Sequence, residues 1–159
     1  MNIRIGHGYD VHKLVSERDL ILCGVKIPWH LGLAGHSDAD VAVHALMDAL
    51  LGAAALGDIG QWFPDKDPAF AGIDSTVLLE KILTSEKFSP YRIVNVDITI
   101  ISQAPKLSPY REEMRQKMAE KMTLPPDAVS IKFTTTEKLG FAGRGEGIAA
   151  DAVVLLQKN

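Results

Sequence analysis

The chain has 159 residues, the usual size of one domain and long enough to bury a core without disulfides or a structural metal. With 47% hydrophobic and 23% charged residues it reads as an ordinary soluble globular protein, so any metal site is expected to be functional. The net charge of −3 argues against a nucleic-acid partner, and no window approaches the ~18 apolar residues of a membrane span.

The opening residues alternate between apolar and polar side chains and predict a strand. Because the chain reads directly into this strand, we expect no signal or transit peptide and a cytoplasmic location. A second strand is predicted over 20–27, after a charged connecting loop at 16–19. The single cysteine, Cys23, lies in that apolar run and is predicted to be a buried small hydrophobe rather than a nucleophile.

From Ser37 onward the apolar residues recur at three- and four-residue steps, which predicts an amphipathic helix. We expect Ser37 and Asp40 to form a capping box at its start and Gly57 to end it. The stretch 57–72 is rich in Gly, Pro and Asp and is predicted to be a loop.

The second half of the chain continues to mix helices and strands. A helix is predicted over about 75–87, a strand over 93–100, and a helix that opens at Ser108-Pro109. That last helix carries Met114, Met118 and Met122 on one face, and we expect them to fill the core. Strands over 129–133 and 148–156 follow, separated by the glycine-rich stretch 139–147. These elements predict a single α+β domain over 1–159, with a mixed sheet and helices packed on one face.

One group of residues has the composition of a catalytic zinc site. Asp10 and His12 are two apart at the end of the predicted first strand, so their side chains share a face. His44 lies in the predicted helix among Ala and Val. One carboxylate and two imidazoles can bind zinc and leave a fourth position for substrate. The alternative is that His44 only packs in the core and Asp10 caps a turn.

Two further segments contain polar residues that could bind a phosphate or a metal ion. The segment 57–65 is an acidic loop punctuated by glycine, and it follows the helix that carries His44. The segment 132–138 is a strand that runs into three threonines, a carboxylate and a lysine. The threonines are consistent either with an edge strand or with a phosphate and divalent-metal site at Glu137.

Five segments in this order carry a resemblance to a known family: 6–12, 36–40, 48–60, 103–106 and 134–141. Over essentially the whole chain the sequence resembles the 2-C-methyl-D-erythritol 2,4-cyclodiphosphate synthases of the non-mevalonate isoprenoid pathway. The resemblance implies a metal-dependent phosphorus–oxygen lyase that converts 4-diphosphocytidyl-2-C-methyl-D-erythritol 2-phosphate to the cyclic diphosphate and releases CMP. It also implies a homotrimer with active sites between subunits.

The resemblance further implies roles for individual residues. One zinc ion per subunit would be bound by Asp10, His12 and His44, and a second divalent cation, Mg²⁺ or Mn²⁺, by Glu137. His36 and Thr135 would stabilise the transition state. The methylerythritol phosphate end would be held by Ser37, Asp58, Ile59, Gly60, Phe63, Pro64 and Asp65. The other substrate-binding residues, mostly in the cytidine pocket, would be Ser102, Gln103, Ala104, Pro105, Lys106, Leu107, Ser108, Thr134, Thr136, Phe141 and Arg144.

The sequence departs from the family pattern near the cytidine pocket. Phe133 stands where the family often has Ala, and Leu107-Ser108 stands where it often has Met-Leu. The metal ligands show no departure.

Two other functions compete with this interpretation. A metallophosphoesterase is suggested by the acidic segments at Asp10 and Asp58, but that class also needs an Asn-His segment, and no Asn-His dipeptide occurs. A non-catalytic trimer that binds isoprenoid diphosphates is suggested by Arg144 between two glycines, because three copies around an axis could hold an anion. The glycines do not have the spacing of a dinucleotide-binding fingerprint.

Overall fold

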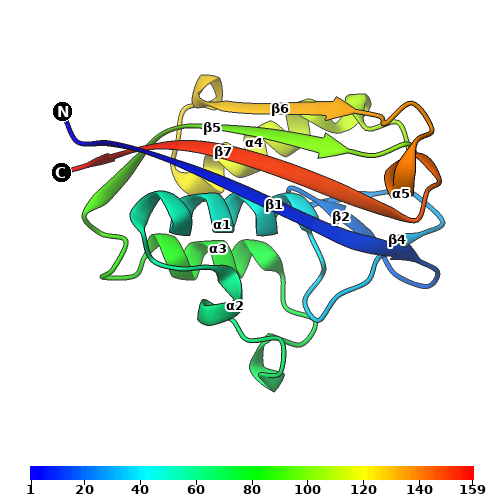
Figure 1. Cartoon of the computed structure of the whole chain (residues 1–159), viewed down its shortest axis with the longest axis horizontal. Coiled ribbons are helices and arrows are strands. Elements are labelled where there is room, and N and C mark those ends of the chain that lie inside the picture. Colours follow the sequence, from blue (N-terminus) through cyan, green and yellow to red (C-terminus); the bar gives the residue numbers. More distant parts are fainter.

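The computed structural model describes residues 1–159 and is built around a five-stranded mixed sheet (Figure 1). The strand order is β4-β1-β7-β5-β6, with bounds Gly32–Leu33, Ile3–Val15, Gly147–Lys158, Tyr91–Ile101 and Val129–Thr134. All neighbouring strands pair antiparallel except β5 and β6, which are parallel. The predicted mixed sheet in an α+β fold is confirmed.

The helices cover one face of this sheet, also as predicted. Helix α1 (Val41–Ala54) packs on β1 and β7, and α4 (Arg111–Met122) packs on β6. Helix α3 (Ser75–Leu83) lies against α1 and α4 on the side away from the strands (Figure 1). The three methionines of α4 and the thiol of Cys23 are buried in the resulting core, as expected. No helix has both the length and the apolar character needed to cross a membrane.

Two glycines allow α1 to lie directly on β1. A Cβ atom on Gly6 or Gly8 would come 1.9 Å from the carbonyl oxygen of Ala49 or Ala45, respectively. Only residues without a side chain permit such an approach of strand and helix backbones. These two contacts set the distance between the backbones of α1 and β1.

The opposite face of the sheet carries no helix. It exposes the apolar side chains of Ile5, Tyr9, Val11 and Val153, with Ile5 72% exposed. One polar pair lies among them, in which His7 Nε2 is 2.6 Å from an Asp151 carboxylate oxygen. The solvent-exposed face of a sheet usually carries polar side chains. This face is therefore unusually apolar.

The ends of α1 differ from the expectation. Asp40, and not Ser37, caps the helix, because its carboxylate accepts a hydrogen bond from Val43 N. The helix ends at Ala54, and Ala55 adopts the left-handed conformation at φ 57° with its N–H bonded to α1 carbonyls. This closure falls two residues before Gly57, at a modest backbone cost of about 1–2 kcal/mol for a non-glycine residue.

The strand expected over 20–27 is in fact a hairpin of β2 (Leu20–Leu22) and β3 (Val25–Ile27). Both turn residues, Cys23 and Gly24, have positive φ, as a two-residue hairpin turn requires. The Asp40 carboxylate accepts hydrogen bonds from both of their N–H groups. The turn is therefore stabilised by a distant side chain that local sequence patterns do not reveal.

Other boundaries also needed correction. The stretch 57–72 contains helix α2 (Ile59–Trp62) and the 3-10 turn η1 (Pro68–Phe70), because Asp58 and Asp67 cap them. The helix predicted over 75–87 stops at Leu83. The segment from Ser108 begins as a 3-10 turn, η2 (Ser108–Tyr110), before α4 starts. The remaining short elements are η3 (Pro126–Ala128) and α5 (Gly140–Gly143), which lies in the glycine-rich stretch.

Candidate active site

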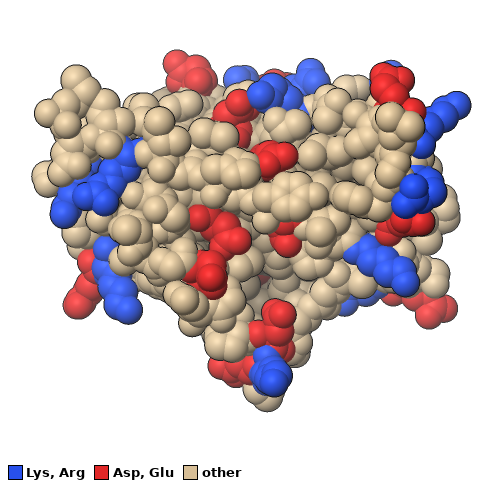
Figure 2. Space-filling view, in the orientation of Figure 1, with Lys and Arg blue, Asp and Glu red and all other residues tan.

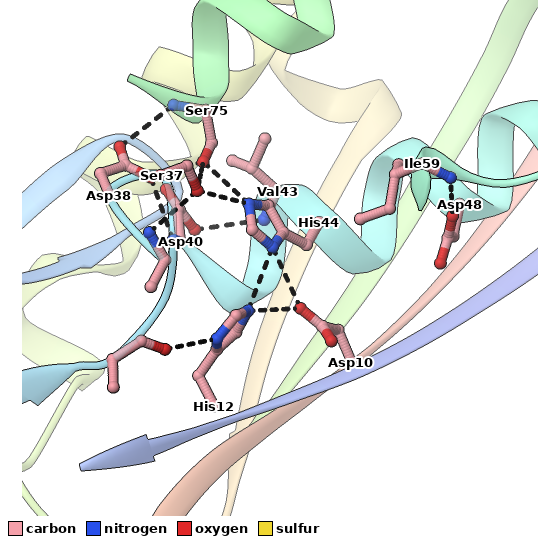
Figure 3. Close-up of polar contacts among 12 residues, drawn as sticks. Asp10, His12, Ser37, Asp38, Asp40, Val43, His44, Asp48, Ile59 and Ser75 are labelled. Carbon is pink, nitrogen blue, oxygen red and sulfur yellow. Dashed lines mark hydrogen bonds and ion pairs between the residues drawn. The ribbon is translucent and has the colours of Figure 1, made fainter. Parts of the chain in front are cut away.

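The three residues with zinc-ligand chemistry converge on one point (Figure 3). His12 Nε2 lies 2.8 Å from Asp10 Oδ2, and His44 Nδ1 lies 3.2 Å from the same oxygen. The two ring nitrogens are 3.1 Å apart. The predicted convergence of a strand pair and a helix residue is confirmed, although β1 does not end at His12 but continues to Val15.

The spacing of these donors fits a tetrahedral zinc ion. Bonds of about 2.0–2.1 Å at tetrahedral angles put neighbouring ligand atoms about 3.3–3.4 Å apart. The three donor–donor distances are close to this spacing, and a small expansion would admit the ion. Moreover, His12 Nδ1 is 2.7 Å from the Ala34 carbonyl oxygen, which can only accept. The proton of neutral His12 therefore sits on Nδ1, and the Nε2 lone pair faces the point of convergence.

Electrostatics keep the carboxylate of this group ionised. Burial raises the pKa of Asp10, but the contacts of its carboxylate with the His12 and His44 rings outweigh this effect and leave the pKa well below its ordinary value. For His12, burial lowers the pKa and the neighbouring Asp10 carboxylate raises it, with a net increase. A metal ion would have to displace the proton that Asp10 helps His12 to retain.

The converging residues form the floor of a cavity of about 210 Å³. Its walls come from the loop before α1, from α1 and α3, and from the segment 59–70. The lining residues are Asp10, His12, Gly35, His36, Ser37, His44, Met47, Ile59, Gly60, Phe63, Asp65, Phe70 and Leu78.

Most residues assigned by resemblance to the methylerythritol phosphate end therefore lie around one cavity. Asp58 and Pro64 are not in its lining: Asp58 caps α2, and Pro64 is exposed between two lining residues. His36 is oriented by a hydrogen bond from its Nε2 to the Asp67 carbonyl oxygen at 2.9 Å. The loop that carries His36 and Ser37 is fixed by Arg18, whose guanidinium donates to the carbonyl oxygens of Leu33 and Ser37.

The charge of this cavity is negative. Asp10 and Asp65 line it, and no Lys or Arg does. In the space-filling view acidic side chains lie around the central hollow, whereas Lys and Arg lie mainly toward the edges (Figure 2). A phosphate group could bind here only with added positive charge, such as a metal ion held by Asp10, His12 and His44 would supply.

A second pocket, of about 330 Å³, lies at the ends of β5 and β6. Its lining residues are Ser102, Gln103, Pro105, Lys106, Leu107, Ser108, Arg111, Phe133, Thr134 and Thr135. The parallel pairing of β5 with β6 brings the two segments together, because the Ser102 N–H donates to the Thr134 carbonyl oxygen. This pocket contains Lys106 and Arg111 and no carboxylate. Its charge is therefore opposite to that of the cavity around Asp10, His12 and His44, called the metal cavity below.

Glu137 lies beyond the second pocket, in an exposed turn. Glu137 and Lys138 both have positive φ, and the Thr135 hydroxyl accepts a hydrogen bond from Glu137 N. Lys138 N donates to the Gln103 side chain, which ties this turn to the pocket. Ala104 and Thr136 are adjacent in the chain to residues of the pocket but do not line it.

Within one chain, the expected site residues do not form a single site. The metal cavity and the second pocket share no residue. Phe141 borders a third, shallow pocket beside His12 and Glu146. Arg144 lies near it and forms a two-pronged ion pair with Glu146 at 3.0 and 3.1 Å.

Sequence reasoning missed several residues that the fold brings to these sites. Arg111 carries no motif, and its guanidinium lies 5.1 Å from the centre of the Phe133 ring. Ser75 reaches the far side of the His44 ring, and Asp38 in turn bonds to Ser75. Only the contact between α3 and the loop before α1 brings the last two together, and no spacing in the sequence indicates it.

Comparison with known proteins agrees with the geometry. The model of the YgbB family matches residues 3–157. The chain is 57% identical over 156 residues to the 2-C-methyl-D-erythritol 2,4-cyclodiphosphate synthase of Thiobacillus denitrificans, a match that covers 98% of each protein.

Solved structures of related proteins have the same fold. A structure of 2-C-methyl-D-erythritol 2,4-cyclodiphosphate synthase with bound CDP matches at a TM-score of 0.88 and 40% identity, over 97% of this chain and 100% of the other. The bifunctional IspDF of Campylobacter jejuni matches at 0.94 and 41% identity over 99% of this chain. The chain spans only 43% of that bifunctional protein.

Proposed function

The chain belongs to the YgbB family, and we infer that it is a 2-C-methyl-D-erythritol 2,4-cyclodiphosphate synthase. It converts 4-diphosphocytidyl-2-C-methyl-D-erythritol 2-phosphate to the cyclic diphosphate with release of CMP. The observation that carries this function is the convergence of Asp10, His12 and His44 on the floor of a cavity that His36 and Ser37 border.

In this reaction the 2-phosphate of the substrate attacks the β-phosphorus of its own diphosphate, and CMP leaves. No general base is needed, because the attacking phosphate is already an anion at neutral pH. Reaction within one molecule removes much of the entropic barrier, provided that the chain of the substrate is held folded. The residues of the cavity wall, with the His36 and Ser37 loop fixed by Arg18, are suited to hold it in that form.

We assign one zinc ion per chain to Asp10, His12 and His44, and a second divalent cation, Mg²⁺ or Mn²⁺, to Glu137. When bound, the zinc ion would supply positive charge to phosphoryl oxygens in a cavity that has no basic side chain, and the second ion would add positive charge from the turn that carries Glu137. His36 and Thr135 would add hydrogen bonds to the same oxygens. Lys106 and the turn around it would hold the cytidine half of the substrate.

A complete site requires two copies of the chain in this proposal. The metal cavity is smaller than the roughly 300–1,000 Å³ of pockets that hold drug-sized ligands, and the second pocket shares none of its residues. We propose the homotrimer that the family resemblance implies, with the metal cavity of one subunit facing the cytidine pocket of the next. The uncovered apolar sheet face with Ile5, Tyr9 and Val11 supports an interface between copies. Location in the cytoplasm stays a prediction from the sequence.

Phosphorus NMR of the products tests the function directly. Incubation with the cytidine diphosphate substrate should give the cyclic diphosphate and CMP, with no inorganic phosphate. Release of inorganic phosphate would instead indicate a metallophosphoesterase. Turnover that persists after complete removal of metal would contradict the proposed site, whereas binding of a diphosphate without any turnover would indicate a purely binding protein.

A further inference from the structure

The two nitrogens of the His44 ring face different surroundings (Figure 3). Nδ1 points to Asp10 and His12, at the proposed metal position. Nε2 points the other way, 3.0 Å from the Ser75 hydroxyl oxygen and 3.1 Å from the Ser37 hydroxyl oxygen. The proton of a neutral imidazole can occupy only one of the two nitrogens, so these surroundings decide whether Nδ1 can bind a metal.

The direction of the hydrogen bonds on the Nε2 side follows from Asp38. The Ser75 hydroxyl donates to an Asp38 carboxylate oxygen in a short hydrogen bond. The other Asp38 oxygen accepts from Ser75 N at 3.1 Å, and Asp40 N donates to the first at 3.1 Å. An ionised carboxylate only accepts, and a serine hydroxyl has a single proton to give. The Ser75 hydroxyl therefore gives its proton to Asp38, and its oxygen can only accept from His44. The Ser37 hydroxyl can give its own proton to the Ser75 oxygen, 3.4 Å away, and its oxygen then also accepts from His44 Nε2.

We propose that Asp38 and Ser75 are positioning residues that hold the proton of His44 on Nε2 and so leave the Nδ1 lone pair free for the metal. This inference rests on the proposed function of Asp10, His12 and His44 as metal ligands. It adds a carboxylate–hydroxyl–imidazole chain behind one ligand. The second ligand is arranged in the same way by the backbone, since the Ala34 carbonyl fixes the proton of His12.

The surroundings of Ser75 support this role over a purely structural one. Ser75 is fully buried at the first position of α3. The cap of that helix is Asp74, whose carboxylate accepts from Thr76 N and from the Thr76 hydroxyl. The Ser75 hydroxyl is therefore not needed to cap α3, and both of its strong contacts lie on the line from Asp38 to His44.

Zinc affinity of the full-length protein tests the proposal. Titration of the metal-free protein with zinc in competition with a chromogenic chelator should give about one tight site per chain for the wild type. Ser75→Ala and Asp38→Asn should each weaken this site about 10- to 100-fold, the usual effect of losing a group that orients a metal-bound histidine. The visible spectrum of the cobalt-substituted protein should change in the same variants, because the geometry of the His44 ligand is altered.

Two matched variants separate this effect from damage to α3. Asp74→Asn and Thr76→Ala alter an equivalent carboxylate–hydroxyl pair in the same helical turn, but neither residue contacts His44. Both should keep wild-type zinc affinity even where they lower stability. If they weaken zinc binding as much as Ser75→Ala and Asp38→Asn do, the proposal is wrong.

Nitrogen-15 NMR of the histidine rings in the metal-free wild type gives a readout that does not depend on any variant folding. At alkaline pH the ring of His44 should carry its proton on Nε2. A proton on Nδ1 would overturn the inference. In Asp38→Asn the amide can donate to Ser75, which frees the Ser75 proton for His44, so the Nδ1–H form should gain population.

These measurements also distinguish the proposed metal site from the proposed positioning role of Asp38 and Ser75. Failure of the wild type to bind zinc would remove the proposed metal site and, with it, the proposed function. Tight zinc binding by the wild type, with equal affinity in Ser75→Ala and Asp38→Asn, would overturn the positioning role alone.

Discussion

Gly8 and Ala45 lie so close that a Cβ atom on Gly8 would come within 1.9 Å of the Ala45 carbonyl oxygen. Ala45 is the neighbour of His44 in α1, and Gly8 is two residues before Asp10 in β1. The contact between the two backbones therefore sets the distance between His44 and the strand that carries Asp10 and His12. The absence of a side chain at Gly8 is therefore needed for the convergence of Asp10, His12 and His44.

A methyl group at this contact should damage both fold and site. Gly8→Ala forces the strand and helix backbones apart, and we expect the free energy of unfolding to fall by about 1–3 kcal/mol. Zinc affinity should fall with it, because His44 moves away from Asp10. Urea denaturation and zinc titration measure the two effects.

Gly52 provides the matched control for this substitution. It lies in α1 as well, but a Cβ atom there would meet nothing within 4 Å. Gly52→Ala should raise the free energy of unfolding by roughly 0.5–1 kcal/mol, the gain in helix propensity, and leave zinc binding unchanged. Equal effects of the two substitutions would mean that the contact between Gly8 and Ala45 does not constrain the site.

The metal ligands themselves should behave as a unit. His12→Ala and His44→Ala should each lose the bound zinc and the activity together, because two donors do not hold the ion in this cavity. Circular dichroism should show that both variants stay folded, since the core does not depend on the metal. Full zinc occupancy in both variants, measured by atomic absorption, would disprove the ligand assignment.

Asp40 should make stability depend on pH. Burial, together with the nearby Asp38 charge, raises the pKa of Asp40 from 3.8 to about 7, although three backbone N–H groups act to lower it. Between these values the native state holds a proton that the unfolded chain has released, so stability falls as pH rises through this window. The contribution of Asp40 is on the order of a few kcal/mol across the window.

The comparison of wild type with Asp40→Asn isolates this contribution. Both proteins are unfolded with urea in metal-free buffer at several pH values within that window. The variant should be less stable at the acidic end, because its amide nitrogen cannot accept from Gly24 N, whereas the hydroxyl oxygen of the protonated Asp40 carboxyl can. Its stability should decline less with pH than that of the wild type. Parallel curves for the two proteins would contradict the raised pKa.

Periodicity predicted most of the elements but not their ends. Alternation over 3–11 and the helical spacing from Val41 depend on burial, which the side chains themselves record. The hairpin turn at Cys23-Gly24 and the start of α1 both depend on the carboxylate of Asp40, which acts at a distance along the chain. Local patterns could not reveal that contact, so the predicted single strand and the Ser37 cap were wrong.

The residues of the candidate site were likewise predictable only in part. Asp10 and His12 could be paired from their spacing alone, and the metal-ligand chemistry of His44 was visible from its residue type. Arg111 and Ser75 could not be found, because each reaches its site only through packing of a helix whose register the sequence does not specify. The assignment of Lys106 and its neighbours to cytidine came from resemblance, and it stays a prediction for this chain.

Glu137 should be required for turnover but not for zinc. Its exposed turn lies next to the second pocket and outside the group of zinc donors. Glu137→Gln should therefore abolish activity, because the second cation loses its ligand, while the zinc content stays at the wild-type level. Undiminished activity of the wild type with zinc as the sole divalent ion would show that no second cation is needed.

Mixing two inactive variants tests whether the site is shared between copies. His44→Ala disables the metal cavity, and Glu137→Gln removes the ligand of the second cation, beside the second pocket of the same chain. If each site combines one pocket from each of two neighbouring subunits, random reassembly of an equal mixture restores about one quarter of the sites. Assembly is checked by analytical ultracentrifugation. A mixture that assembles and stays inactive would place the whole site within one chain.

The second pocket should discriminate cytidine from purine nucleotides. Most residues of the irregular turn over 102–108 line this pocket, and we expect its backbone N–H and carbonyl groups to recognise a pyrimidine edge. The Phe133 ring also lines the pocket, where its centre lies 5.1 Å from the Arg111 guanidinium. We expect CMP to bind at least tenfold more tightly than AMP, a difference of about 1.4 kcal/mol.

Calorimetry with the monophosphates measures this preference without the metal-bound diphosphate. The assembled wild type is titrated with CMP, UMP and AMP, and the same series is repeated with Lys106→Ala and, as a control from the other cavity, Asp65→Asn. Lys106→Ala should weaken CMP binding, because Lys106 is one of only two cationic side chains in the pocket, whereas Asp65→Asn should leave the CMP preference intact. Comparable affinities for CMP and AMP in the wild type would mean that the cytidine site lies elsewhere on the protein.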